Sequence, residues 1–286
     1  MVHLRFYFST ATLNSLLMDF RHSRRFAAEQ AKNLCGDLYP GPILMPRGLL
    51  RALDPILAVA LGPANNPTTE FSESFEQMLR GRPDGPLLLA LWASTTSGEI
   101  PHADLRKILK YFPEPLPERP ANRGELLAFL HPRVSIIACC TLSLAQRRDA
   151  DALPAAERLG LGLVLTKLLI ELPQHLVAGK LYFPVSDLQK ANLTEEGLFD
   201  MVRTPEVDQF LSAQCDWALS LIEEGLPACD KVGARLRRGL FAAAQRAQMI
   251  LRQIRNPKND IFRCPPQLSA HERWRCAMHA WTPLKK

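Results

Sequence analysis

Three side chains that could bind a ligand recur at every fourth position near the middle of the chain. They are Lys167, Glu171 and His175. In an α-helix this spacing places them on one face. The carboxylate and the imidazole could ligate a metal, and the lysine could bind an anion. The structural alternative is a Lys–Glu pair beside a histidine in the core or at its rim. We favour it, because a lysine next to a glutamate competes with a metal.

Composition is that of an ordinary folded chain. Of the 286 residues, 47% are hydrophobic and 22% are charged. The net charge of +6 is compatible with an anionic partner such as a diphosphate or a membrane surface. The chain has no long Lys/Arg run and no nucleic-acid-binding signature, so we expect no nucleic-acid partner. The seven cysteines include no C-x-x-C pair. Cys139 and Cys140 lie in an apolar run, which favours buried, reduced thiols over disulfides or zinc.

Helical periodicity dominates the second half of the sequence. Thr204 and Pro205 predict the start of a helix that ends near Gly225. Apolar residues recur at helical spacing over residues 236–254, and a further helix is predicted over residues 151–171. Pro- and Gly-rich segments separate the helices, and no segment alternates like a strand. The sequence therefore predicts a single all-α domain of antiparallel helices.

Localisation is predicted from hydropathy and from the first residues of the chain. The longest apolar run, residues 134–145, is shorter than the roughly 20 residues that span a bilayer. We therefore expect a cytoplasmic protein or one at a membrane surface. Residues 1–25 are basic and rich in Ser and Thr, which is typical of an organellar import segment. An additional helix or a start site placed too early are the alternatives, and we favour them.

Several segments together resemble the squalene/phytoene synthase family. Residues 165–184, LTKLLIELPQHLVAGKLYFP, are similar to the family's LTNILRD-x-x-x-D followed by G-[RK]-x-Y-[LF]-P. The resemblance implies an all-α helical bundle of the isoprenoid-synthase type over residues 26–281. Residues 1–25 would then be an N-terminal extension, and residues 282–286 a basic tail. The other similar segments are Leu38-Tyr39-Pro40, Leu44-Met45-Pro46, Ala52-Leu53, Glu125–Phe129, Asp187-Leu188, Asn259–Phe262 and Leu268-Ser269.

The first Asp-rich motif that the resemblance implies is absent. The family joins two prenyl diphosphates, and magnesium held between two Asp-rich motifs binds the departing diphosphate. The position of the first motif falls near Ala64, Asn65 and Thr68, none of which is acidic. Pro63 and Pro67 would also disrupt a helix there.

The second Asp-rich motif is altered. Glu171 stands at its first Asp and His175 at its second, and Lys167 replaces the usual Asn. Lys180 and Tyr182 match the basic and aromatic positions of the segment that follows, where the resemblance places them beside the diphosphate. A plain structural turn explains these two residues equally well. We therefore predict no catalytic residue, and Glu171 is the only candidate for a metal ligand.

These departures predict a family member without prenyltransferase activity. It would act by binding a partner protein or an isoprenoid- or lipid-like ligand, and would need no cofactor. The alternative is an active prenyltransferase of terpenoid biosynthesis whose Mg²⁺ is held by carboxylates from elsewhere. A third hypothesis is a subunit that supports an active paralogue. The carboxylates available for the alternative are Asp54, Glu70, Glu73 and Glu76.

Overall fold

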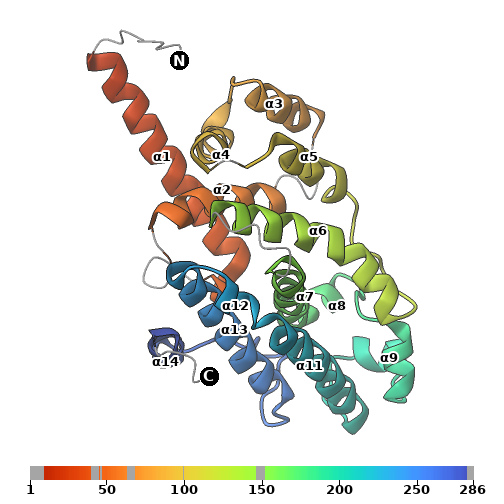
Figure 1. Cartoon of the computed structure of the whole chain (residues 1–286). Helices are drawn as coiled ribbons and strands as arrows, with labels where there is room; N and C mark the ends of the chain where they lie inside the picture. The colour runs from red at the N-terminus through yellow and green to blue at the C-terminus, as the bar shows by residue number, and fades with distance from the viewer. Residues whose placement is uncertain are drawn as a thin grey trace.

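The computed structural model describes residues 10–39, 45, 47–62, 68–98, 100–145 and 152–281, which form helices and no strand (Figure 1). The predicted all-α fold is confirmed. The elements are α1 (Thr10–Cys35), the 3₁₀ turn η1 (Gly36–Leu38), α2 (Arg47–Leu61), α3 (Thr69–Leu79), α4 (Gly85–Gly98), α5 (His102–Tyr111), α6 (Arg123–Leu144), α7 (Ala152–Ile170), α8 (Leu172–Val177), α9 (Val185–Lys190), α10 (Glu195–Phe199), α11 (Pro205–Gly225), α12 (Ala228–Lys231), α13 (Ala234–Arg255) and α14 (Ala270–Trp281).

Helix α6 joins two large apolar clusters and so makes the helices one domain. Its first half contributes Leu126 and Leu130 to the larger cluster, which is formed mainly by α7, α11 and α13. Its second half contributes Ile136 and Cys140 to the cluster formed by α2, α3, α4 and α5. In Figure 1, α6 accordingly runs across the middle of the molecule, between these two groups of helices.

The helices predicted from periodicity are confirmed. The Thr204 side chain accepts a hydrogen bond from the backbone N–H of Val207, and α11 runs from Pro205 to Gly225. The predicted stripe over residues 236–254 forms α13. The predicted helix over residues 151–171 is α7, which ends at Ile170. Pro173 lies in the first turn of the next helix, α8. Proline fits this position because the first turn of a helix leaves its N–H groups without intrahelical partners.

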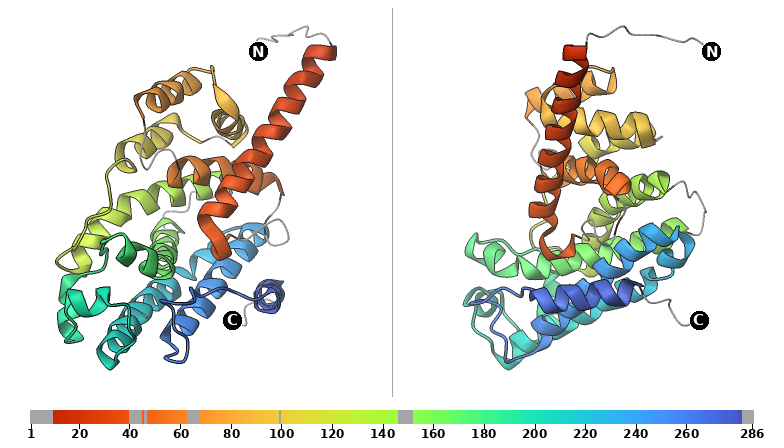
Figure 2. Two further views of the ribbon diagram at one scale, coloured as in Figure 1. Left: turned by 180° about the vertical axis from the view of Figure 1, so that it is seen from behind. Right: turned by 90° about the vertical axis from the view of Figure 1, so that its left-hand side faces the viewer.

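Helix α1 extends across the predicted boundary at residue 25. It packs against α2 and α4, and the ring of its Phe20 stacks on Trp92 of α4 with centroids 6.4 Å apart. Figure 2 shows α1 standing out at one end of the molecule. The helix therefore belongs to both the predicted extension and the predicted domain.

The expectation that no segment could span a bilayer needs a correction. Among the described residues, α6 is long and apolar enough to do so by length and composition. The sequence-based estimate missed it because the apolar count began at Val134, whereas the helix begins at Arg123. Half of the helix's most apolar stretch is buried against its neighbours, as in a core helix.

Helices α7 and α11 pack backbone against backbone at two glycines. A Cβ atom on Gly225 would lie 2.2 Å from the backbone N of Leu159, and one on Gly162 would lie 2.6 Å from a side-chain carbon of Ile222. Since backbone atoms cannot move aside as a flexible side chain can, α11 can approach α7 this closely only without a side chain at residue 225.

We predict that Gly225→Ala lowers the free energy of unfolding by about 2–3 kcal/mol, because the added methyl group forces the two helices apart. Urea unfolding followed by circular dichroism measures the change. Gly48→Ala in α2 is the matched control, since nothing lies within 4 Å of its added Cβ. The control should be neutral or stabilise the protein by up to about 1 kcal/mol. Equal stability of the two variants would contradict the close packing.

Candidate functional site

Lys167 and Glu171 form an ion pair where α7 ends. The lysine Nζ lies 2.5 Å from Oε1 of Glu171, and each side chain is about one-third exposed. The helical hydrogen bonding continues through the bend, because the N–H of Glu171 donates to the Lys167 carbonyl and the N–H of His175 donates to the Glu171 carbonyl. The three side chains therefore keep the spacing of one helical face, with the acid already paired.

His175 packs on Tyr182 rather than joining the ion pair. The two rings meet edge to face with centroids 4.8 Å apart. A turn at Gly179, whose φ of 73° suits glycine, brings the chain back so that the Lys180 N–H donates to the His175 carbonyl. Tyr182 is buried, whereas Lys180 is exposed with its Nζ 4.0 Å from Glu118. The segment forms a turn in which Tyr182 packs inward and Lys180 lies at the surface beside Glu118.

Two lysines and one glutamate act on the pKa of His175. Burial lowers the pKa of its imidazole, and the charges of Lys167 and Lys180 lower it further, while Glu171 alone opposes them. The imidazole is therefore neutral near pH 7. Lys167 lies beside Glu171, and Lys180 lies 4.0 Å from Glu118. Both carboxylates therefore already have a cationic neighbour, which is a poor environment for a divalent cation.

A second polar group lies where α1, η1 and α2 meet. The Tyr39 hydroxyl donates a 2.8 Å hydrogen bond to Oδ1 of Asp54, a buried carboxyl of α2. Burial raises the pKa of Asp54 to about 6, although the bond from Tyr39 opposes the rise. Burial also raises the pKa of the Cys35 thiol to about 11; Lys167 lowers it and Asp54 raises it. The charges of Lys167 and Asp54 thus both act on the Cys35 thiol.

The sequence did not predict this second group. The sequence indicates Asp54 only as a substitute metal ligand and Tyr39 only as part of a motif. Their partnership joins positions 15 residues apart across the 39–47 connection, which no local pattern reveals. The one available signal was Asp54 itself, the single acidic residue of α2, which lies between apolar residues.

The remaining substitute carboxylates lie elsewhere. Glu76 pairs with Arg106, whose Nε lies 3.2 Å from Oε1, and Glu73 is exposed on α3. Ala64 and Asn65, at the expected first motif, lie outside the described residues. Thr68 caps α3 by accepting a hydrogen bond from the N–H of Phe71.

The donor set does not fit a magnesium cluster. Within the described ranges, no group of three or more His, Cys, Asp or Glu side chains is arranged to hold a metal ion. Mg²⁺ requires several oxygen ligands in octahedral geometry. Glu171 is paired with a lysine, and Asp54 retains its proton more readily than an exposed carboxyl. No step of a metal-dependent reaction can be assigned to these side chains.

Asp187 holds neighbouring helices together. Its side chain is 1% exposed and lies 2.6 Å from Nε of Arg123, while Lys190 and Gln214 also donate to it. Burial would raise the pKa of this carboxyl, but the hydrogen bonds from Gln214, Arg123 and Lys190 outweigh burial and lower it. Asp187 follows the Tyr182 segment, so these bonds link α9 to α6 and α11 and position that segment.

Asp260 has a local role of the same kind. Its carboxylate accepts a hydrogen bond from the N–H of Phe262 and pairs with Arg263 at 3.2 Å. These contacts hold the turn after α13. Two conspicuous acids of the motif-bearing segments thus have structural partners.

Solved structures with the same arrangement of helices include a squalene synthase and a dehydrosqualene synthase by title. The chain resembles squalene synthase HpnC from Alicyclobacillus acidocaldarius at 17% identity and a TM-score of 0.70, covering 84% of this chain and 94% of that one. It resembles a dehydrosqualene synthase solved with a ligand at 16% identity and a TM-score of 0.76, covering 93% and 97%. YisP from Bacillus subtilis subsp. subtilis strain 168 matches at 15% identity and a TM-score of 0.73, covering 92% and 98%. These likenesses define the class as an all-α isoprenoid-synthase-type bundle.

The sequence model of the squalene/phytoene synthase family matches residues 46–282. The chain therefore belongs to the squalene/phytoene synthase family, as its motifs indicated. The match begins later than the predicted start at residue 26 and ends one residue beyond the predicted end. No curated protein sequence matches the chain significantly.

We predict that Asp54 makes stability depend on pH between about 4 and 6. Its folded-state pKa of about 6 exceeds the value near 4 of an unfolded chain, so the folded state binds this proton more tightly. Its contribution is therefore greatest below pH 4 and declines as the pH rises through 6, by about 2–3 kcal/mol.

The test compares wild type with Asp54→Asn by urea unfolding at pH 4 and pH 7. The amide cannot titrate but can still accept the Tyr39 hydrogen bond, so the variant should gain stability relative to wild type at the higher pH. Glu73→Gln, an exposed site on α3, is the control and should follow wild type. Parallel pH curves for wild type and Asp54→Asn would refute the assignment.

Proposed function

We propose that this protein is a squalene/phytoene synthase family member without prenyltransferase activity, which acts by binding a partner protein or an isoprenoid- or lipid-like ligand. The observation that carries the proposal is the ion pair between Lys167 and Glu171. It places an ammonium group against the one carboxylate of the second motif. An ammonium group beside that carboxylate repels a divalent cation and occupies the carboxylate oxygen that the cation would need as a ligand.

Diphosphate departure gives the physical reason. Charge on the leaving group must be neutralised as the bond breaks, and metal ions supply several kcal/mol of that stabilisation. Lys167 and Lys180 could attract a diphosphate electrostatically. Two flexible ammonium groups, however, do not provide the fixed octahedral clamp of a metal cluster. The proposal therefore allows the site to bind an anion without cleaving it, and it requires no cofactor.

The buried residues around the site support a binding role, because they maintain the fold of the family. Tyr182 and Asp187 are buried and form the contacts described above. Their contacts join α8, α9, α6 and α11 within the chain itself. A scaffold stabilised in this way can be used for recognition after its chemistry is lost.

The direct test is diphosphate release. Full-length protein incubated with farnesyl or geranylgeranyl diphosphate and Mg²⁺ should release diphosphate no faster than the Glu171→Ala variant. An active dehydrosqualene synthase assayed in parallel shows that the conditions support turnover. Metal-dependent release well above that of Glu171→Ala would establish the alternative, an active prenyltransferase.

A second test restores the ligands. In Lys167→Asn/His175→Asp the competing ammonium group is removed and a second carboxylate lies one turn from Glu171. We expect Mg²⁺ to raise the melting temperature of this variant but not that of wild type, because a metal that binds only the folded state stabilises it. Lys110→Asn/His102→Asp, at exposed sites on α5, is the matched control. Equal responses of wild type and the double variant to Mg²⁺ would contradict the proposed competition.

A further inference from the structure

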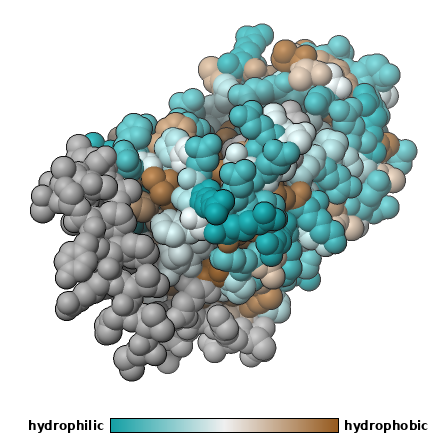
Figure 3. All heavy atoms as spheres, turned by 90° about the horizontal axis from the view of Figure 1, so that it is seen from above, coloured by the Kyte–Doolittle hydropathy of each residue, from teal (hydrophilic) through white to brown (hydrophobic). Residues whose placement is uncertain are grey.

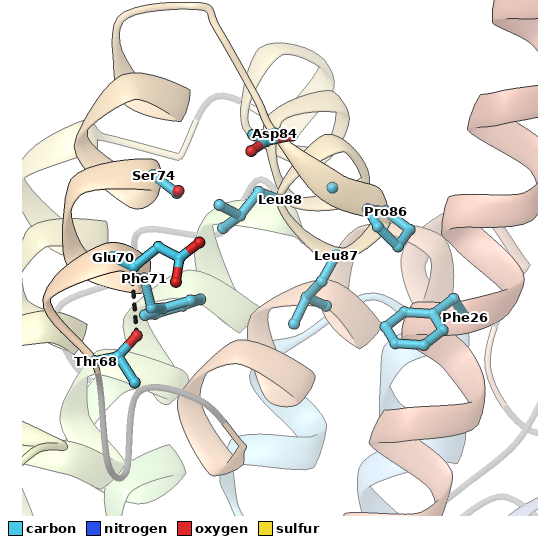
Figure 4. A pocket seen from close by; sticks show the side chains of 10 residues that line it. Phe26, Thr68, Glu70, Phe71, Ser74, Asp84, Pro86, Leu87 and Leu88 are labelled. Atoms are coloured by element: carbon cyan, nitrogen blue, oxygen red, sulfur yellow. Dashed lines mark hydrogen bonds between the residues drawn. The ribbon is translucent and has the colours of Figure 1, made fainter.

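An open groove lies between α1, α3 and α4. It belongs to the part of the molecule built around the second apolar cluster, the one formed by α2, α3, α4 and α5. Its volume is about 330 Å³, enough for one or two large side chains. Figure 4 shows Phe26 from α1 facing Pro86 and Leu87 from α4, with Phe71 of α3 on the other side. Leu88 completes the apolar lining.

The floor of the groove is part of the protein core. Leu88 is 4% exposed, and Phe71 and Leu87 pack against the second apolar cluster. The ring of Phe71 lies 6.2 Å from that of Phe75, which is fully buried. An apolar side chain that entered the groove would meet a surface already formed, and no ordering of the floor would oppose its binding.

The rim of the groove is acidic. Glu70 and Asp84 line it and are exposed, and among the described residues no lysine or arginine lines it, although the chain carries a net charge of +6. In the part of the chain that the structure describes, Glu76 of the same helix pairs with Arg106, whereas neither rim carboxylate has an ion-pair partner within 4.0 Å. Figure 4 shows both carboxylates beside the apolar lining.

Hydrophilic residues make up most of the coloured surface at this end of the molecule (Figure 3). Figure 3 views the molecule from above, at the end that carries α1, α3 and α4, and hydrophobic residues show there only in small areas among hydrophilic ones. A small apolar hollow with charge of one sign suits a short segment with a matching pattern better than a broad, flat interface.

We propose that this groove docks a cationic segment of a partner protein. One large apolar side chain of the segment fills the hollow between Phe26, Phe71 and Leu87, and adjacent Lys or Arg side chains pair with Glu70 and Asp84. The aromatic faces can also attract such a cation. The groove is open to solvent, which suits a chain that continues beyond it. The inference rests on the proposed function, because it gives the expected protein partner a surface and a chemistry.

Phage display of random 12-residue peptides on the full-length protein provides the test. Binders are counter-selected on Glu70→Lys/Asp84→Lys. Peptides with Lys or Arg next to Leu, Phe or Trp should be enriched. A synthetic version of the best one should bind wild type at least about tenfold more tightly than either single charge-reversal variant, as fluorescence anisotropy measures. Phe26→Ala should also weaken binding, and melting curves confirm that each variant is folded.

Glu73→Lys is the matched control, because it reverses an exposed charge on the same helix without lining the groove. Its affinity for the peptide should stay within about twofold of wild type. No enrichment over counter-selection, or equal weakening by Glu73→Lys and Glu70→Lys, overturns the proposal. The proposal is also overturned if the wild-type protein self-associates and Glu70→Lys converts it to a monomer, because the groove would then bind a second copy of the chain. It is overturned as well if tetraethylammonium at the concentration of the peptide displaces the peptide, because the site would then recognise a small cation. Diphosphate release in these variants tests the proposed function separately.

Discussion

Close contact between the backbones of α7 and α11 sets the geometry on which the candidate site depends. Gly162 and Gly225 allow these helices to approach without intervening side chains, and α6 and α13 also pack against α7. The end of α7 is therefore fixed by core packing. Lys167 and Glu171 lie at and just beyond this end, four residues apart, so the fold itself places their side chains within reach of each other.

Local signals in the sequence predicted local structure well. The limits of α11 follow from a threonine cap, a proline that suits the first turn and a stripe of apolar residues. The pairing of Lys167 with Glu171 follows from a spacing of four residues in a helix. The family and its all-α fold were likewise predicted from short motifs and their order, since those motifs lie where helices begin, turn or end.

Contacts between distant segments could not be predicted in this way. The bond from Tyr39 to Asp54 requires η1 and α2 to fold together, and the effect of Lys167 on Cys35 requires α1 to reach α7. The packing of His175 on Tyr182 depends on the turn at Gly179, which the sequence marked without indicating what it would bring together. The acidic groove joins three helices and carries no motif. Spatial neighbours of this kind follow from tertiary packing, which periodicity does not encode.

The sharing of α6 between two clusters has a consequence for how the molecule comes apart. Leu126 and Leu130 belong to one cluster and Ile136 to the other, all on one continuous helix. Unfolding of either cluster frays α6 and so removes part of the packing surface of the other cluster. Heat should therefore unfold both halves in one cooperative transition. A molecule that grips only the α1–α3–α4 end would consequently slow proteolysis around α11 and α13, far from its own contacts.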